Sequence, residues 1–345
     1  MARLGKGVGA PARGDAQEHR PLRDGRRPRP ARRHGARLRR RRGCAPAGGR
    51  RPVTHAEPFA DKLRHAVASC AGAPVCVGLD PVFERLPPRL GADAPDPVAA
   101  IERFCVGVIE ATVGVAGVVK AQSACFERYG GAGFDALRRV RDAAGAHGAL
   151  FILDAKRGDI GVSAEHYAAM AFGALDADAL TVNAYMGADT VGPYLDAARW
   201  GRRGVFVLVR PRHPRRPAQQ TARLDSRATL APPLARAVAA LGAGRLGACG
   251  YSDVGAVVAA TKPGDAADLR ARMKEQVFLV PGFGAQGGDA ASVRALFDAA
   301  GFGAVVTASR SVIYPRLDAG ESWRDGVRRA AGEFARTVSS AAGVA

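Results

Sequence analysis

Residues 149–161 read Ala-Leu-Phe-Ile-Leu-Asp-Ala-Lys-Arg-Gly-Asp-Ile-Gly, an apolar run followed at once by charged residues and glycine. Five apolar residues in succession, without polar alternation, are typical of a strand buried on both faces. Asp154 and Lys156 are two residues apart, so they share one face where the strand gives way to a loop. Asp159 follows Lys156 by three residues. In the sequence, the ammonium of Lys156 therefore lies between the carboxylates of Asp154 and Asp159. The stretch therefore predicts a buried strand that ends in a charged cluster.

Seven further apolar runs are spaced along the chain, separated by longer Ala-rich segments that contain scattered Arg residues. Continuous apolar strands that alternate with helices form parallel sheets buried on both faces. Eight such units predict an α/β fold, the closed (β/α)8 TIM barrel, which typically takes about 250 residues. The predicted strands cover residues 75–79, 115–120, 149–154, 179–183, 204–209, 254–259, 277–280 and 304–307.

Polar or glycine-rich residues follow nearly every predicted strand. Barrels of this type assemble their active sites from residues at the carboxyl ends of the strands. These ends carry Asp80, Lys120, the cluster of Asp154, Lys156 and Asp159, then Asn183, Arg210, Thr261, residues 281–288 and Arg310.

The last two strand ends indicate a phosphate site. Residues 281–288 read Pro-Gly-Phe-Gly-Ala-Gln-Gly-Gly, and Arg310 lies between two serines after the eighth strand. Glycines let backbone amides approach an anion closely, and an Arg side chain offers a bidentate fork. Alone, a glycine-rich loop is more often a turn, and the charged cluster could be a solvated turn with Asp159 capping the next helix. Their occurrence together at strand ends favours a phosphate-binding active site.

The net charge of +19 is concentrated in residues 1–52, which hold 17 of the 51 Lys and Arg but three of the 32 Asp and Glu. This leader carries +14 and residues 53–345 carry +5. Because it has few large apolar residues, we expect it to be disordered, with the barrel in residues 53–345. A nucleic-acid-binding arm and an Arg-rich transit peptide are two interpretations. We favour a third, a mis-assigned start, since Val53 is what an internal GUG codon would encode, and so we expect no nucleic-acid partner.

The six cysteines show no Cys-x-x-Cys spacing, and no apolar stretch reaches the roughly 18 residues of a membrane span. Reduced cysteines in apolar surroundings predict a cytoplasmic protein with no membrane association.

Several separated motifs together resemble one enzyme family, orotidine 5'-phosphate decarboxylase, in its longer bacterial branch. The resemblance spans about residues 57–335 and is most specific in Asp154-Ala-Lys156-Arg-Gly-Asp159-Ile-Gly. The supporting motifs are Val77-Gly-Leu-Asp80-Pro, Val119-Lys120-Ala-Gln122-Ser, Thr181-Val-Asn183-Ala-Tyr185-Met-Gly, Pro281-Gly282 with Gln286-Gly287-Gly288, and Ser309-Arg310-Ser311.

The resemblance implies cofactor-free and metal-free removal of CO2 from orotidine 5'-monophosphate, giving uridine 5'-monophosphate. It implies that Lys156 stabilises the C6 carbanion and donates the proton. It also implies that Asp154 is set against the departing carboxylate, and that Lys120 orders the charged network and touches the ribose region. It also implies a homodimer in which Asp159 reaches the site of the neighbouring subunit. The substrate-binding residues that it implies are Asp80, Ser163, Asn183, Gln286, Gly287 and Arg310.

The chain departs from the family pattern after the fifth predicted strand. The family usually has Arg-Thr-Ser-Asn-Pro-Gly there, with the Ser contacting the pyrimidine, whereas residues 210–216 read Arg-Pro-Arg-His-Pro-Arg-Arg. Either the region 210–227 has diverged, or it is misreported in the same Arg- and Pro-rich manner as the leader.

Three rival hypotheses remain open at this point. A Mg-dependent sugar-phosphate synthase or epimerase of the same superfamily shares related motifs, but Lys120 at a strand end would repel its cation. Metal-dependent turnover would favour that rival. The second rival is a catalytically impaired homologue. The third is a protein that binds nucleic acid through its basic leader. Salt-dependent DNA binding that is lost in a chain starting at Val53 would support this third hypothesis.

Overall fold

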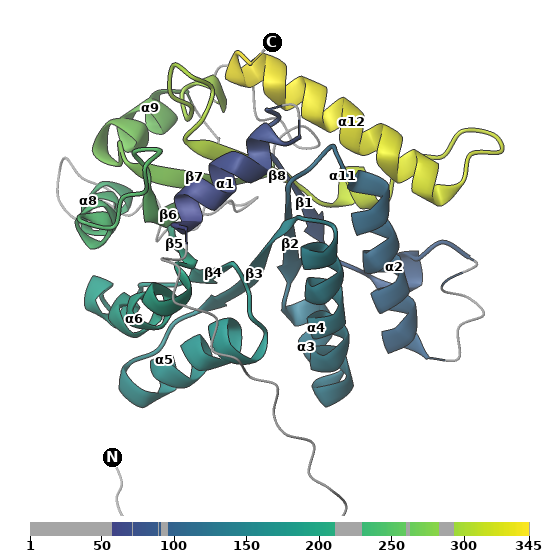
Figure 1. Ribbon diagram of the computed structural model, residues 1–345, viewed down its shortest axis with the longest axis horizontal. Coiled ribbons are helices and arrows are strands. Elements are labelled where there is room, and N and C mark those ends of the chain that lie inside the picture. Colours follow the sequence, from purple (N-terminus) through teal and green to yellow (C-terminus); the bar gives the residue numbers. More distant parts are fainter. Residues whose placement is uncertain are drawn as a thin grey trace, which may run out of the picture. The chain divides into compact units, whose positions relative to one another are not determined.

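Eight parallel strands close into a barrel in the order β1 to β8, each paired with its neighbours in sequence and β8 paired with β1 (Figure 1). The computed structural model describes residues 57–344 except 71, 89, 91–95, 211–229, 260–262 and 283–292. The predicted leader and its boundary at residue 53 lie outside these residues. The strands are β1 Val75–Leu79, β2 Val118–Gln122, β3 Leu150–Arg157, β4 Ala179–Val182, β5 Gly204–Arg210, β6 Ser252–Val258, β7 Gln276–Pro281 and β8 Ala304–Ala308.

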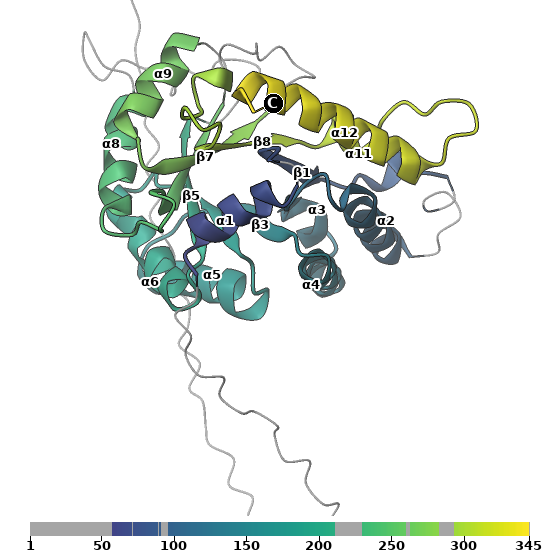
Figure 2. The same cartoon turned by 45° about the horizontal axis from the view of Figure 1, so that its top comes forward.

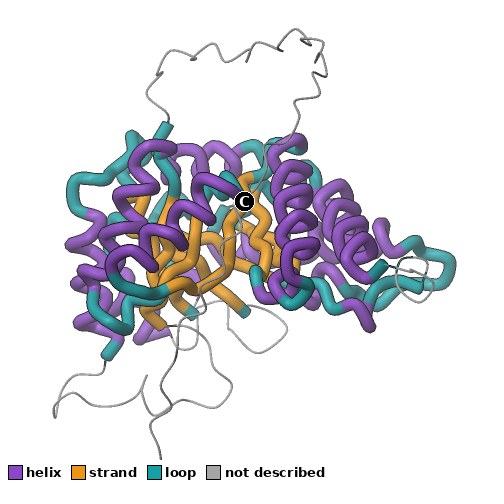
Figure 3. Tube along the Cα trace, turned by 90° about the horizontal axis from the view of Figure 1, so that it is seen from below, coloured by secondary structure: helices purple, strands orange, loops and turns teal. Residues whose placement is uncertain are grey.

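Helices surround the strands, as Figure 3 shows. This arrangement confirms the predicted (β/α)8 barrel and its eight strands. The α-helices are α1 Phe59–Ala68, α2 Pro97–Thr112, α3 Ala124–Glu127, α4 Gly130–Ala146, α5 Gly161–Ala168, α6 Gly192–Gly201, α8 Ala231–Gly242, α9 Pro263–Arg272, α11 Arg310–Ile313 and α12 Trp323–Ala342. Short 3-10 helices cover Phe83–Arg85 and Ala188–Val191, and a π-helix covers Ala169–Ala174.

Two strand boundaries differ from the prediction in ways that matter for the site. β2 begins at Val118, three residues later than expected, and continues to Gln122. β3 runs past Asp154 to Arg157, and its register against β4 shifts between Leu153 and Arg157. The charged residues therefore lie within a bulged strand end, where the sequence had suggested the start of a loop.

The strands bury side chains on both faces, which explains their uninterrupted apolar sequences. One buried cluster fills the barrel interior and includes Cys76, Ile152, Phe206 and Val305. The other lies between the strands and the surrounding helices. Buried polar strand residues lie toward the ends of the strands: Ser252 and Gln276 begin β6 and β7, whereas Lys120, Thr181 and Thr307 lie toward the carboxyl ends.

Capping side chains mark the amino-terminal ends of two outer helices. At the start of α2, Asp96 accepts hydrogen bonds from the amides of Val98 and Ala99, at 2.8 and 3.3 Å. The hydroxyl of Ser322 accepts one from the amide of Asp325 at the start of α12. Such caps satisfy amides that have no partner inside the helix. α12 packs beside α2 (Figure 2).

Helix α1 closes the amino end of the barrel. Phe59 is buried against Phe206 of β5, with ring centroids 5.8 Å apart and the rings at 86°. Gly204 makes this approach possible, because a Cβ there would lie 2.3 Å from the Phe59 ring. The opposite, carboxyl end is the one that remains available for a site.

Candidate active site

Four charged side chains from three neighbouring strand ends meet at the carboxyl end of the barrel. Lys120 of β2 donates from Nζ to Oδ2 of Asp154 on β3, at 2.7 Å. Lys156 donates from its own Nζ to Oδ1 of the same carboxylate, at 2.5 Å. Asp80, directly after β1, has Oδ1 3.8 Å from Nζ of Lys120. The charges therefore alternate in sign across three strand ends.

Burial gives this array its electrostatic character. Lys120 and Asp154 are 6% and 7% exposed. Burial alone would raise the pKa of Asp154, but Lys120 and Lys156 outweigh it and lower the pKa to about 2. Burial would likewise lower the pKa of Lys120, yet Asp154 and Asp80 hold it above its usual range. Both groups are therefore ionised at neutral pH.

The backbone of Lys156 has a left-handed conformation, with φ at +48°. A residue with a Cβ rarely adopts it, and it costs on the order of 1–3 kcal/mol. The amide of Lys156 donates to Oγ1 of Thr181 on β4, at 2.9 Å, and this hydroxyl donates to Oδ1 of Asp154, also at 2.9 Å. Thr181 thus links the strained backbone of one catalytic candidate to the carboxylate of the other.

A cavity of about 240 Å³ opens beside the charged array. One side is lined by residues from β1 to β3, namely Asp80, Lys120, Gln122 and Asp154, and the other by the ends of β7 and β8 with Arg310 and Ser311. Arg310, the first residue of α11, is exposed. The predicted phosphate residue Arg310 therefore borders the same cavity as Asp80, Lys120 and Asp154 of the charged array.

Three predicted site residues lie apart from that array within the described chain. Asp159 accepts a hydrogen bond from the amide of Ile160, at 2.9 Å, and makes no ion pair with Lys156 there. It lies near Tyr194, whose pKa is raised to about 12 by burial and by this carboxylate. Asn183 is exposed and accepts from the amide of Tyr185, and Ser163 is exposed on α5. Their predicted roles stay predictions.

Gln286, Gly287 and Thr261 lie outside the described residues, as do residues 211–229 of the unusual region after β5. Arg210, at the end of β5, forms an ion pair with Asp265 of α9, at 2.6 Å. It is thus engaged by a neighbouring helix.

Sequence reasoning missed Thr181, Gln122 and Thr307 as members of the site. Thr181 lies two residues before Asn183, and Gln122 lies two residues after Lys120. Alternation along a strand could have placed Gln122 on the same face as Lys120. The hydroxyl of Thr181 carried no such signal, because its role depends on the bulge in β3.

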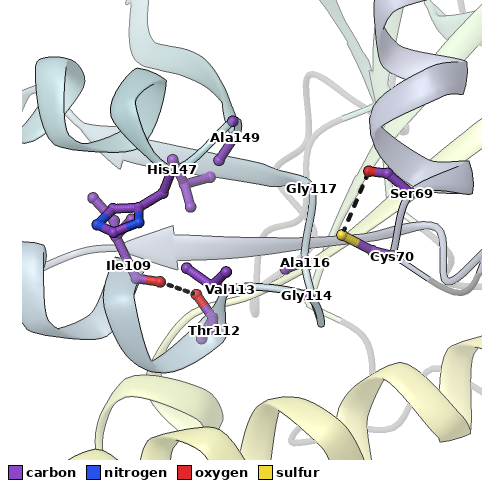
Figure 4. Close-up of a pocket in the computed structure, with 12 residues that line it drawn as sticks. Ser69, Cys70, Ile109, Thr112, Val113, Gly114, Ala116, Gly117, His147 and Ala149 are labelled. Atoms are coloured by element: carbon purple, nitrogen blue, oxygen red, sulfur yellow. Dashed lines mark hydrogen bonds between the residues drawn. The ribbon is translucent and has the colours of Figure 1, made fainter.

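A second cavity, of about 190 Å³, lies beside the amino-terminal ends of β2 and β3. Figure 4 shows the residues that line it. It is lined by the ends of α1, α2 and α4, with Cys70, Thr112 and His147 among its residues. Oγ1 of Thr112 donates to the carbonyls of Val108 and Ile109, and the hydroxyl of Ser69 donates to Ala66. Both hydroxyls therefore already donate to carbonyls of the helices that carry them.

A helix that spans a membrane needs about 20 predominantly apolar residues. Within the described ranges, no helix is both long and apolar enough to cross a bilayer.

Comparisons with known proteins agree with the geometry. Residues 73–324 match the sequence model of the orotidine 5'-phosphate decarboxylase / HUMPS family. An orotidine 5'-phosphate decarboxylase from Rhodopirellula baltica is 39% identical over 291 residues, covering 79% of this chain and 96% of the relative. One from Bordetella pertussis is 41% identical over 294 residues, covering 82% and 97%. The structure of the Leishmania donovani OMP decarboxylase matches with a TM-score of 0.66 at 32% identity, covering 84% of this chain and all of that one. This chain therefore belongs to the orotidine 5'-phosphate decarboxylase / HUMPS family.

Proposed function

We propose that this protein decarboxylates orotidine 5'-monophosphate to uridine 5'-monophosphate, a step of pyrimidine biosynthesis, without a cofactor. The observation that carries the proposal is the array of Lys120, Asp154 and Lys156 beside a cavity that Arg310 also borders. The curated relatives above bear the name of this activity.

The chemistry explains why a lysine between carboxylates suits this reaction. When the bond from C6 to the carboxylate breaks, its electron pair stays on C6, in the plane of the ring and orthogonal to the π system. A fixed positive charge beside C6 can stabilise that pair. Lys156 then gives a proton from Nζ to C6 and regains one from solvent.

Asp154 contributes a negative charge next to the departing carboxylate. Lys120, Lys156 and Thr181 all donate to it, and its pKa of about 2 keeps it ionised. Repulsion between Asp154 and the substrate carboxylate is relieved as CO2 leaves. This repulsion therefore destabilises the bound substrate more than the transition state. Lys120 holds Asp154 in place for this task.

The rest of the nucleotide fits the remaining polar groups of the cavity. Oδ1 of Asp80 is buried and accepts no hydrogen bond from the described residues, which suits a ribose hydroxyl. Arg310 can hold the phosphate, together with the predicted Gln286 and Gly287 amides. Binding energy from the phosphate, remote from C6, can be used to lower the barrier.

A second copy of the chain completes the site in this proposal. The residues around Asp159 and Asn183 are unusually apolar for a surface: Ile160, Val162 and Tyr185 are 61%, 65% and 85% exposed. An exposed apolar patch of this kind is typical of a protein interface. Covering it with a second copy would let Asp159 approach the active site of the neighbouring subunit.

The Mg-dependent alternative is disfavoured by the position of Lys120. Its ammonium lies between Asp80 and Asp154, 3.8 and 2.7 Å from their oxygens. A divalent cation ligated by these carboxylates would meet that charge directly. We also infer a reducing, cytoplasmic location, because the five cysteines in the described residues are all free.

The test is turnover of orotidine 5'-monophosphate in EDTA, followed by ultraviolet absorbance. We expect metal-independent turnover that falls by about 10³-fold or more in Lys156→Ala, since both charge stabilisation and proton donation are lost. Lys274→Ala, which removes an exposed lysine remote from the cavity, is the matched control and should behave like the wild type. Turnover of other sugar phosphates that requires Mg²⁺ would instead support the superfamily rival.

A further inference from the structure

The end of β3 is anchored in the helix layer by Arg157, the residue that follows Lys156. Its guanidinium forms an ion pair with Glu127, the last residue of α3. The same group lies over the ring of Tyr167 on α5, with Cζ 5.1 Å from the ring centroid. The carbonyl oxygen of Arg157 accepts a hydrogen bond from the amide of Asn183, the residue after β4, at 2.7 Å. Arg157 is thus tied to the segments that follow three successive strands.

Glu127 is itself held in place. The hydroxyl of Ser123 donates to the same Oε1 that receives Arg157. Ser123 is buried, and its amide donates to the carbonyl of Asp154, at 3.2 Å. The side chains of Arg157 and Glu127 are 22% and 28% exposed, so water and salt screen this pair less than a surface pair. We refer to Glu127, Arg157 and Tyr167 as the clamp.

The clamp acts on a strained segment. Lys156 has a left-handed backbone inside the bulge of β3, and such a conformation persists where the surroundings enforce it. Because Lys156 and Arg157 share a peptide bond, movement of Arg157 would rotate the backbone that aims the lysine. On the far side, a Cβ at Gly158 would lie 2.5 Å from the carbonyl oxygen of Asn183, so the chain leaves the bulge tightly against β4.

We propose that the Glu127–Arg157–Tyr167 clamp positions Lys156 by holding the bulged end of β3, so that the ammonium stays against Asp154 and faces the reacting carbon. Arg157 and Glu127 are positioning residues here, because they act through the backbone of Lys156. The inference rests on the proposed decarboxylase function, and it predicts that loss of the clamp harms catalysis more than nucleotide binding.

The test uses Arg157→Gln, Glu127→Gln and the double variant in the full chain. We expect kcat to fall about 10- to 100-fold while KM and the Kd for uridine 5'-monophosphate change by less than about threefold, since the phosphate and ribose contacts remain. The double variant should lose no more than the worse single variant, because both remove the same interaction. Arg157→Lys, which keeps the charge without the planar fork, should recover part of kcat.

The matched control is the Arg139–Glu102 pair, which joins α4 to α2 by two hydrogen bonds of 2.9 and 2.7 Å. Arg139→Gln should leave kcat unchanged. Titration with uridine 5'-monophosphate counts the correctly folded sites in each variant. If kcat falls only in proportion to the number of folded sites, or by the same factor as in Arg139→Gln, the positioning role of the clamp is rejected. The Glu127–Arg157 ion pair would then have a purely structural role.

A readout without turnover separates this inference from the proposed function. An amine-directed acylating reagent, followed by peptide mass spectrometry, should label Lys156 faster in Arg157→Gln than in wild type, with Lys120 unchanged. If this difference in Lys156 labelling is found but the wild type does not decarboxylate orotidine 5'-monophosphate, the proposed function is rejected and the clamp is retained. An active wild type whose Lys156 labelling and kcat do not respond to Arg157→Gln would reject the clamp alone.

Discussion

At the scale of single residues, Asp154 shows how a buried carboxylate becomes useful. Burial penalises its charge, yet the ammonium groups of Lys120 and Lys156 lower its pKa to about 2. The folded protein therefore holds a carboxylate that is harder to protonate than in the unfolded chain, where the value is near 3.8. Such a difference links protonation to stability.

This linkage gives a prediction for acid pH. Because the folded pKa is the lower one, the contribution of Asp154 to stability is present above about pH 4 and is lost as pH falls toward 2. It amounts to about 2 kcal/mol. In Asp154→Asn the amide cannot titrate, so the Tm gap between wild type and variant should be widest near pH 6 and should narrow as pH falls.

Tm recorded by calorimetry from pH 6 to pH 2 measures this gap. Asp135→Asn, at an exposed carboxylate of α4, serves as control and should give a small gap at every pH. A gap for Asp154→Asn that stays constant over this range would contradict the ionised, paired carboxylate.

At the scale of elements, the barrel separates stability from chemistry by its two ends. α1 seals the amino end through Phe59, whereas the charged array lies at the carboxyl end. Catalytic residues of such barrels gather at the carboxyl end because the loops there are free to vary while the strands hold them. Changes in α1 should therefore alter unfolding without altering catalysis.

Phe59→Ala makes this separation measurable. Removing a buried aromatic side chain leaves a cavity and should lower the free energy of unfolding by about 3–5 kcal/mol. Phe134→Ala, at a partly exposed Phe of α4, should cost far less. Denaturant titration gives both values, and kcat well below the Tm should match wild type. A large loss of kcat in the still folded Phe59→Ala would show that the two ends are coupled.

At the scale of the whole molecule, the proposed dimer places parts of one active site on two chains. A symmetric pair would repeat the contact twice, once for each site. The exposed apolar residues around Asp159 mark the face that would be covered. Shared sites of this kind allow two inactive variants to restore activity together.

We expect Lys156→Ala and Asp159→Ala to be inactive alone and to regain activity when they are mixed under conditions that exchange subunits. Each mixed dimer then holds one intact site, so random exchange should restore about a quarter of wild-type activity. Sedimentation at the assay concentration reports the dimer. A mixed population that stays inactive although subunits have exchanged would place Asp159 in the site of its own chain, or outside the site altogether.

The sequence by itself determined the architecture and the main candidates. Eight apolar runs predict eight buried strands because parallel strands in a barrel must be apolar on both faces. Alternation of side chains places Asp154 and Lys156 on one face, and the position after a strand marks Asp80 and Arg310. These inferences need local patterns alone. The barrel and the positions of Asp80, Asp154 and Arg310 at strand ends agree with the structure, and the roles of these residues stay predictions.

Tertiary structure alone decided how these residues meet. Lys120 contacts Asp154 across 34 residues of chain because β2 and β3 are paired with Lys120 opposite Ile152. The left-handed backbone of Lys156 arises from the register shift between β3 and β4, and the bridging hydroxyl of Thr181 depends on it. A register between strands is set by closure of the whole barrel, so no local pattern in the sequence could reveal it.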